Sequence, residues 1–386
     1  MFGGASRSLI ELWRGLQTTG FHGTVVCPAG STAERFRSVG FDTVEVAGLS
    51  QWDDTRYGHY RGLRWLILLR EIAWLLPSLL VVWRMRSQKF DVIHVNEITL
   101  LLCGILARQS LRAPLVVHVR SLQRGTSGGL RTRLMVKLLR KFGDAIVAID
   151  ETVRATLPSD LPIKVIHNTV ARPPRGTEPP TTKQHLRVAS VSVLHENKGI
   201  YEFAEAARVC RDRGLPVDFL IVGENARDCR GLRGWLLRRL KMARDVRRDI
   251  DEFVARYGLE RTVSLVGFLS DVGRVYRDID VLCFPSRLNA PGRPVFEAAF
   301  HGVPSIVVVD QPSKDTIVPG VTGLCLERAD PVLLADAIER MYRNPEERRR
   351  MGEKARELAE RYFDSSTNAA LLGDVYTELA LGRRQP

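Results

Sequence analysis

NAPGRPVFEAAFHGVPSI, residues 289–306, predicts a loop, then a short helix, then a buried strand. Pro294 suits the first turn of that helix, because a proline there gives up an N–H that has no helical partner. Gly292 lets the backbone come close to a ligand, and the open amides that follow favour a bound anion. The stretch therefore predicts a helix start that holds a negatively charged group.

Two side chains of the same helix suggest what that group is. Glu297 lies a turn inside the helix, where its carboxylate can accept hydrogen bonds from two ribose hydroxyls, as acidic residues do in other nucleotide sites. Arg293 would add a charge-assisted contact to a phosphate. We therefore expect a nucleotide diphosphate at this helix start.

Length and composition set the frame for this site. A chain of 386 residues exceeds one ordinary core and predicts two domains of roughly 150 to 200 residues. A hydrophobic content of 45% can fill both cores, and a net charge of +13 indicates anionic partners: nucleic acid, phosphorylated small molecules or an acidic membrane face. The six scattered cysteines predict neither a disulfide framework nor structural zinc.

We expect a cytoplasmic protein, or one that is peripheral on the inner face of the plasma membrane. Met1 and Phe2 lead into glycines, with no secretory signal pattern. The segment 63–83, LRWLILLREIAWLLPSLLVVW, is interrupted by charges and broken at Pro77, so its apolar part is too short to span about 30 Å of hydrocarbon. It is either a core helix between sheet and loop or an interfacial segment with a tryptophan at each end.

From residue 23 onward, short apolar runs alternate with helical stretches, which is typical of a parallel sheet wrapped by helices. We expect helices over 98–109 and 129–142. The strands of one first sheet are expected at 24–28, 42–46, 91–96, 115–119, 145–149 and 164–168.

The stretch 171–186 carries four prolines and little to bury, so it predicts a linker. A second βα series follows it, with strands expected at 187–193, 217–223, 262–268, 281–285 and 305–309. The expected organisation is two doubly wound domains, over 1–170 and 187–363, and a C-terminal helix over 364–386 that packs back toward the first domain.

One expected element is missing at the start. A doubly wound domain opens on a central strand that feeds its first glycine turn, but this chain begins in the turn, at MFGGASRSLIEL. Either the real start lies upstream or the first domain lacks its central strand. We favour an upstream start, because a missing middle strand leaves two rows of buried backbone groups unpaired.

Two further places could hold phosphate. Gly3 and Gly4 precede an apolar helical pattern, so amides and the helix dipole can approach an anion there, unless the glycines are purely steric. Lys198 follows the first strand of the second domain, where a lysine is well placed for a phosphate; the alternative is a solvated helix-cap lysine.

Seven motifs, taken in order, resemble the family 4 retaining glycosyltransferases of the GT-B fold. The match covers nearly the whole chain apart from the missing first strand, and it implies an α/β protein with two Rossmann-like domains facing a central cleft. The motifs are GGASRSL, DVIHVN, VIHNTV, ENKG, VGFLSDV, PS…GRPVFEAAFHGVP and DTIVPGVTGLCL.

The resemblance implies roles residue by residue in the second domain. The family glutamate that holds the donor ribose corresponds to Glu297, and the lysine near the diphosphate corresponds to Lys198. The glutamate that contacts the donor sugar falls on Asn289, an amide. The arginine that accompanies the lysine falls on Val193 or Ser192, so one positive charge is missing.

In the first domain, the catalytic-site histidine of the family aligns with Arg120. His118 lies two residues earlier and points the same way on the strand, so either could reach the cleft; we favour Arg120, at the carboxyl end. Two accounts follow. Either Arg293 and Arg120 restore the cationic surroundings and Asn289 changes the preferred sugar, or the chemistry is lost. The first is more economical.

The resemblance implies a metal-independent, retaining transfer of a sugar from a nucleotide-diphosphate sugar to a glycan or lipid-linked acceptor, in cell-surface polysaccharide biosynthesis and without a cofactor. The alternatives are a non-catalytic nucleotide-sugar-binding protein and a nucleotide-sugar epimerase.

Two other patterns compete with this interpretation. Asp249 with Asp251, and Asp278 with Asp280, have the spacing of a metal-binding pair but lie away from the predicted site groups. The basic runs 230–248 and 131–141 have almost no interleaved aromatics, so we expect no nucleic acid. They suit an anionic membrane surface or a solvated helical face.

Overall fold

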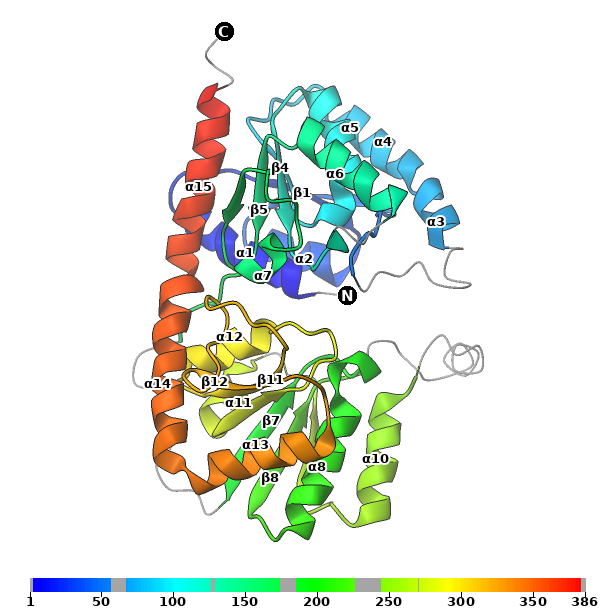
Figure 1. The fold of residues 1–386 in the computed structure, drawn as a ribbon. Helices are drawn as coiled ribbons and strands as arrows, with labels where there is room; N and C mark the ends of the chain where they lie inside the picture. The colour runs from blue at the N-terminus through cyan, green and yellow to red at the C-terminus, as the bar shows by residue number, and fades with distance from the viewer. Residues whose placement is uncertain are drawn as a thin grey trace. The chain divides into compact units, whose positions relative to one another are not determined.

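The computed structural model describes residues 3–56, 67–125, 129–173, 185–225, 244–269 and 271–382. The chain forms two compact units, each built of parallel strands and helices (Figure 1). Unit 1 comprises Met1–Ala171 and Phe363–Pro386, and unit 2 comprises Arg172–Tyr362. The expected linker lies largely outside the described residues, at 174–184.

Unit 2 contains one six-stranded parallel sheet in the order β12-β11-β10-β7-β8-β9. All five expected strands are present; β12 is an addition, a four-residue strand behind a turn, whose sequence has no distinct apolar run. The sheet is buried at its centre, where every residue of β10 and β11 is inaccessible. The bounds are β7 Leu186–Val191, β8 Val217–Val222, β9 Val263–Gly267, β10 Val281–Phe284, β11 Ser305–Val308 and β12 Gly323–Leu326.

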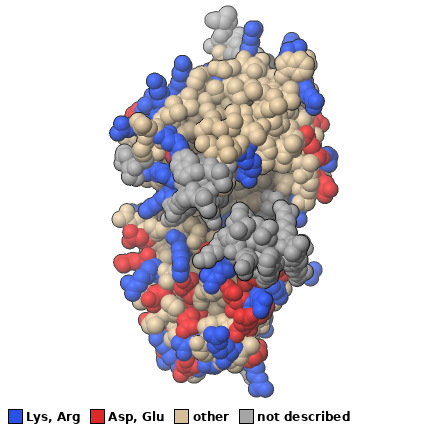
Figure 2. All heavy atoms as spheres, turned by 90° about the vertical axis from the view of Figure 1, so that its right-hand side faces the viewer, with Lys and Arg blue, Asp and Glu red and all other residues tan. Residues whose placement is uncertain are grey.

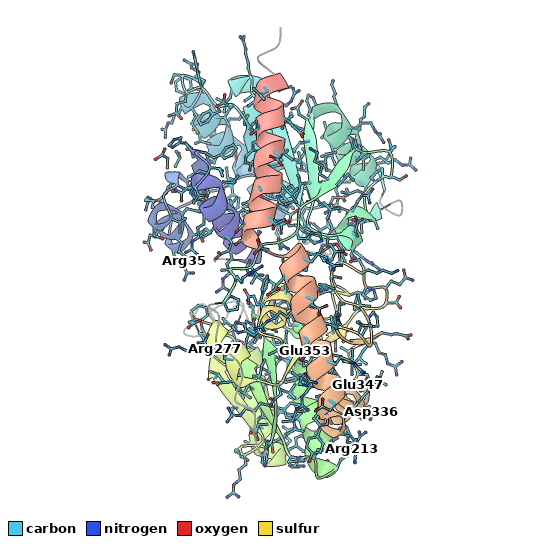
Figure 3. All side chains as sticks on the ribbon, turned by 90° about the vertical axis from the view of Figure 1, so that its left-hand side faces the viewer. Arg35, Arg213, Arg277, Asp336, Glu347 and Glu353 are labelled. Atoms are coloured by element: carbon cyan, nitrogen blue, oxygen red, sulfur yellow. The ribbon has the colours of Figure 1, made fainter. Side chains whose placement is uncertain are left out.

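Helices cover this sheet and complete the core of unit 2. The small residues on one face of α8 let it pack closely on the sheet and on α13. Arg213, just after α8, pairs with Asp336 of α13 at 2.7 Å, and Figure 3 shows both side chains. The helices are η4 Glu196–Lys198, α8 Ile200–Asp212, α10 Val246–Tyr257, α11 Gly273–Asp278, α12 Arg293–Phe300, α13 Pro331–Arg343 and α14 Pro345–Tyr362.

The strands of unit 1 form two sheets, so the expectation of one sheet was wrong. One sheet pairs β1 with β2, and the other has the order β3-β4-β5-β6. The physical reason is that no strand of the described residues lies between the two sheets to share hydrogen bonds with both. The bounds are β1 Thr24–Pro28, β2 Asp42–Val46, β3 Ile93–Val95, β4 Leu115–Val119, β5 Ala145–Ala148 and β6 Ile163–Val165.

The C-terminal helix closes unit 1 by packing on its first helix (Figure 1). Apolar residues of both helices share one core cluster, and Gly15 allows close approach, because a Cβ there would lie 2.5 Å from Ala369. The helices are α1 Gly4–Gln17, α2 Ser31–Ser38, α3 Ile67–Ala73, α4 Leu75–Arg84, η2 Ile98–Leu100, α5 Leu101–Leu111, α6 Leu130–Phe142, α7 Glu151–Arg154 and α15 Ser365–Gly382.

The apolar segment 63–83 folds as two short helices over its described part, which begins at residue 67. The break falls at Trp74, and Pro77 lies in the first turn of α4, where proline is tolerated; the expected break at Pro77 was wrong. Over the described ranges, no helix combines the length and the apolar character needed to cross a membrane.

Gly223 lies at the carboxyl end of β8, and its replacement tests how closely the backbone is packed there. We expect Gly223→Ala to lower the free energy of unfolding by more than about 3 kcal/mol, because it combines backbone strain with overlap. Gly223 has a φ of +148°, and an added Cβ would lie 1.8 Å from the Ser192 carbonyl oxygen. Urea unfolding of both proteins gives the difference.

The matched control is Gly214→Ala, at a φ of +70° in open space. It should cost only the left-handed conformation, about 1 to 2 kcal/mol. Equal losses in the two variants would contradict the overlap at Gly223.

Candidate functional site

The start of α12 lies against the end of β10. Gly292 is the residue before the helix, in extended conformation, and no side chain caps the first turn; Pro294 is the second helical residue. An added Cβ on Gly292 would lie 2.4 Å from the ring of Phe284. The glycine is thus required for contact with Phe284. Pro294 has no N–H and the Val295 N–H donates to the Gly292 carbonyl at 2.9 Å, so the helix mouth attracts an anion mainly through the positive end of its dipole.

Lys198 lies on the same aromatic ring. It ends the short η4 helix, and its Nζ is 5.5 Å from the centroid of the Phe284 ring. Gly199 then turns the chain with a φ of +69°, and a Cβ there would lie 2.0 Å from the Pro285 carbonyl oxygen. Phe284 therefore brings the lysine ammonium and the mouth of α12 together.

Lys198 differs from the arginines on the surface of unit 2. Arg213, for example, contacts two carboxylates, at 2.7 and 2.9 Å, whereas Lys198 has no carboxylate partner among the described residues. Burial lowers the pKa of the Lys198 amine below its ordinary value of 10.5. This is a desolvated cation without a counter-charge, which disfavours the alternative of a solvated helix-cap lysine.

Glu297 is fixed by two neighbours. Arg293 Nε donates to its Oε1 at 2.6 Å, and the hydroxyl of the buried Tyr276 donates to its Oε2 at 2.8 Å. The side chains of Arg293 and Glu297 are each only 12% exposed. In this structure Arg293 is therefore the ion-pair partner of Glu297. Tyr276 was missed in the sequence, because it lies on α11, twenty-one positions away.

Asn289 holds the loop that precedes α12. Its φ is +51°, a conformation that asparagine tolerates better than most residues. Its Oδ1 accepts a hydrogen bond from the backbone N–H of Asp310 at 2.7 Å, just beyond β11. The amide therefore ties this loop to the end of a neighbouring strand.

In unit 1, Arg120 joins several strand ends. Its Nε donates to the backbone and side-chain oxygens of Asn96, both at 3.0 Å, and its Nη1 donates to Asn168 Oδ1 at 2.6 Å. Asn96 Nδ2 in turn donates to the Ala5 carbonyl at 3.2 Å. The residues that follow β3, β4 and β6 thus meet the first turn of α1 at this guanidinium.

His118 shares a face with Arg120 but lies deeper. It has no exposed surface, its Nδ1 is 3.3 Å from Arg120 Nη2, and its ring stacks on His94 at 5.4 Å. His94 also hydrogen-bonds Tyr376 of α15. Burial, reinforced by Arg120, lowers the pKa of His94 to about 3 and that of His118 well below its usual value, so both rings are neutral.

A buried carboxylate supports the same cluster. Glu97 Oε1 accepts hydrogen bonds from the backbone N–H of Ile98 at 2.9 Å and of Arg120 at 3.3 Å, and from Ser121 Oγ at 3.1 Å. Burial raises its pKa. Glu97 was missed in the sequence as a site-supporting residue; its place just after the strand of DVIHVN is the signal that could have found it.

Gly3 and Gly4 are exposed at the start of α1. A Cβ added to either would meet nothing within 4 Å, and neither has a positive φ. Packing and backbone conformation therefore do not require glycine, which disfavours the purely steric explanation. Gly3, Gly4 and Arg120 form one group in unit 1; Lys198, Asn289, Gly292, Arg293, Pro294 and Glu297 form another in unit 2.

Unit 1 also contains a cavity of about 1070 Å³ beside α6. Its lining combines apolar side chains, such as Met135 and Leu139, with arginines and the two carboxylates Asp54 and Asp160. Asp54 Oδ1 lies 3.9 Å from Arg124 Nε, whereas Arg133 has no carboxylate partner among the described residues. A cavity of this mixed character suits a ligand that is apolar in one part and anionic in another.

Comparison with known proteins identifies the family. The model of glycosyltransferase family 4 matches residues 2–171, and that of glycosyl transferases group 1 matches residues 178–358. The chain is a family 4 glycosyltransferase of the GT-B fold. The resemblance of its motifs to that family is thereby confirmed.

Curated relatives match only in part. The chain is 24% identical over 196 residues to the alpha-D-kanosaminyltransferase of Streptomyces kanamyceticus, which is 50% of this chain and 46% of that protein. It is 24% identical over 179 residues to the capsular polysaccharide biosynthesis glycosyltransferase CapM of Staphylococcus aureus, 46% and 42% of the two chains. The aligned part thus spans about half the length of these relatives.

Solved structures match over the whole chain. The crystal structure of Alr3699/HepE from Anabaena in complex with UDP and glucose has a TM-score of 0.73 at 19% identity, and covers 98% of this chain and 97% of that one. A glycosyltransferase from Rickettsia africae has a TM-score of 0.72 at 16% identity, with 98% and 96% covered. At these identities the likeness establishes the GT-B fold of the family.

The unpaired lysine makes a prediction about stability. We expect Lys198→Met to raise the free energy of unfolding of the unliganded protein, because burial disfavours the charged ammonium and a methionine of similar length carries no charge. The folded protein binds this proton less tightly than the unfolded one, so the cost is present at neutral pH and is relieved as pH rises through the lowered pKa toward 10.5.

Thermal unfolding of both proteins between pH 7 and 10 measures this difference, which should shrink as pH rises. Lys354→Met is the control, because Lys354 is half exposed and pairs with Glu357 at 2.8 Å. A destabilised Lys198→Met protein would show that the ammonium is already compensated.

Proposed function

We propose that this protein is a retaining glycosyltransferase that moves a sugar from a nucleotide-diphosphate sugar to a glycan or lipid-linked acceptor in cell-surface polysaccharide biosynthesis. The observation that carries the proposal is the position of Lys198, which has no carboxylate partner among the described residues, beside the uncapped start of α12 across the Phe284 ring. The ammonium of Lys198 and the positive end of the α12 dipole would both be neutralised by a bound diphosphate.

The diphosphate is the leaving group of the reaction, so its charge grows as the bond to the sugar breaks. Lys198 and the helix amides act on that charge from fixed positions in a poorly solvated place, where electrostatic stabilisation is strongest. The free energy that Lys198 loses by desolvation is offset when the anion arrives. The lysine therefore favours the state in which negative charge is greatest.

Glu297 is suited to the donor ribose. Its contacts with Arg293 and Tyr276 fix the direction of the carboxylate, and hydrogen bonds from hydroxyls to a carboxylate are stronger than those to a neutral acceptor. Each carboxylate oxygen has a second lone pair for a ribose hydroxyl. Asn289 offers a neutral amide where the family has a carboxylate, so it changes which donor sugar is preferred.

We assign the acceptor to unit 1. Arg120 and the first turn of α1 present positive potential beside each other, and the cavity of unit 1 has an apolar wall with three arginines and two aspartates. These features suit an acceptor with a phosphate and an apolar chain, such as a lipid-linked sugar. The acceptor hydroxyl attacks from the face that the diphosphate leaves, so the configuration at the anomeric carbon is retained.

Similar proteins support two parts of the proposal: a nucleotide-sugar donor and a role in polysaccharide biosynthesis. HepE of Anabaena has been crystallised with UDP-glucose, and CapM of Staphylococcus aureus bears a name for capsular polysaccharide biosynthesis. Two other functions fit the same site: a nucleotide-sugar-binding protein without turnover, and a nucleotide-sugar epimerase. An epimerase needs acid and base groups at the sugar, and Asn289 supplies neither.

Ligand binding tests the site directly. In a thermal-shift panel of nucleoside diphosphates and nucleotide sugars, we expect one nucleotide to raise the melting temperature of the wild-type protein. Lys198→Ala and Glu297→Ala should each remove most of that shift, while Lys354→Ala keeps it. A ligand whose stabilisation survives both site changes places the pocket elsewhere.

Catalysis requires a separate measurement. With the donor identified, Lys198→Ala should lower kcat for transfer by about 100-fold or more, as expected for loss of a fixed group that stabilises the leaving charge. Proton NMR of the product should show the anomeric configuration of the donor, and EDTA should leave the rate unchanged. An inverted product overturns retention; binding without transfer to any acceptor favours the non-catalytic alternative.

A further inference from the structure

Helices α3 and α4 expose an apolar stripe on unit 1. The side chains recur every three or four residues, so they lie along one side of the two helices. At three of these positions more than half of the residue surface is accessible: 65% at Leu69, 63% at Leu76 and 56% at Trp83. The stripe, called here the α3–α4 face, consists of Leu69, Ile72, Leu76, Leu79, Leu80 and Trp83.

The opposite, buried side of these helices carries two polar residues, Glu71 and Ser78, together with the apolar Val81, whereas an ordinary surface helix buries an apolar stripe. Glu71 Oε2 accepts a hydrogen bond from the backbone N–H of Gln51 at 2.6 Å. Ser78 Oγ accepts from the N–H of Ser50 at 3.1 Å and donates to the Trp74 carbonyl at 2.7 Å. These bonds fix the rotation of the helices, so the apolar stripe is held toward the outside.

Within residues 67–89, which carry the stripe, the exposed charges are all positive; the exposed Asp91 follows just beyond. The only acidic residue between 67 and 89 is Glu71, which is buried and pairs with Arg70 at 2.6 Å. This leaves Arg84, Arg86 and Lys89, all exposed. The Arg86 guanidinium lies 4.4 Å from the centre of the Trp83 ring, so cation and aromatic ring share one place at the end of the stripe.

Figure 2 looks onto the side of unit 1 that carries these helices. A broad area there is neither acidic nor basic, and its edges carry blue side chains and fewer red ones, whereas red and blue side chains mix closely over unit 2. Helix α6 adds exposed Leu130 and Leu134, at 82% and 55%, among four exposed cations and no acidic residue. The four are Arg133, Lys137, Arg140 and Lys141.

We propose that the α3–α4 face docks unit 1 on a bilayer that contains anionic lipids. The leucines enter the boundary between headgroups and acyl chains, Trp83 lies at the interface, and Arg84, Arg86 and Lys89 contact lipid phosphates. This proposal rests on the surface alone and stands whether or not the reaction proposed above is correct.

A second copy of the chain fits this face less well than lipid. Two such faces in contact would bring the cations of both copies together around an apolar centre, with no exposed acidic residue of the same segment to neutralise them. A fluid layer of anionic headgroups supplies both the apolar and the negative partner. Charge complementarity therefore favours the bilayer.

Flotation of the full chain with phosphatidylglycerol-containing and with pure phosphatidylcholine vesicles tests the proposal. We expect flotation with the anionic vesicles at about 0.1 M salt and loss of it with phosphatidylcholine or at higher salt, where exposed charges are screened. The double change Leu76→Gln with Leu80→Gln should weaken partitioning at least tenfold. The triple change of Arg84, Arg86 and Lys89 to Gln should weaken it and flatten its salt dependence.

The matched control is Leu371→Gln with Leu381→Gln, two leucines of α15 that are 45% and 56% exposed. It should float like the wild type. All variants change exposed side chains, so their melting temperatures should stay near the wild-type value. Failure of the wild type to float, flotation of the α4 double variant, or a dimer in sedimentation that this variant abolishes would each overturn the proposal.

Discussion

The chemistry of unit 2 depends on one aromatic side chain at the end of a buried strand. Phe284 packs on Gly292 at the start of α12 and lies under the ammonium of Lys198, so it sets the distance between a cation and a helix mouth. A ring face is a weak partner for an ammonium group in comparison with a carboxylate. The lysine is therefore held in place but not neutralised. A carboxylate here would stabilise the empty protein and remove the reason for an anion to bind.

In unit 1 a cation, Arg120, is also held in place without being neutralised, but by different groups. Arg120 is anchored by neutral amide oxygens of Asn96 and Asn168 and lies against a neutral histidine, so its position is fixed while its charge is kept. A nearby carboxylate, Glu97, accepts hydrogen bonds from backbone and hydroxyl donors around the same strand end. In both units, groups beyond the carboxyl ends of parallel strands converge on a cation, which is where open α/β sheets bind ligands.

The sequence predicted the strands well, because each buried parallel strand is a continuous apolar run between turn residues. It could not predict side-chain pairing across elements. The role of Tyr276 in holding Glu297 depends on how α11 lies against α12, and periodicity within either helix says nothing about that. Arg293 and Glu297 are four residues apart on a helix, so their pairing was within reach, yet the same spacing also allows Arg293 to face a ligand. The six apolar runs of unit 1 do not show which strands share hydrogen bonds; only the glycine turn without a preceding central strand indicated that the sheet could be interrupted.

The α3–α4 segment shows why hydrophobic periodicity alone left two interpretations open. A stripe of leucines at helical spacing predicts that one side of a helix is apolar, but it does not say whether that side faces the protein or its surroundings. The few polar residues on the other side of the helices determine which side faces the protein. Glu71 and Ser78 form hydrogen bonds with the backbone of residues 50 and 51, and rotating the helices would break these bonds and leave buried polar groups without partners. Two polar side chains thus fix the rotation of the helices, and the apolar surface outside is a consequence that only an apolar partner can offset.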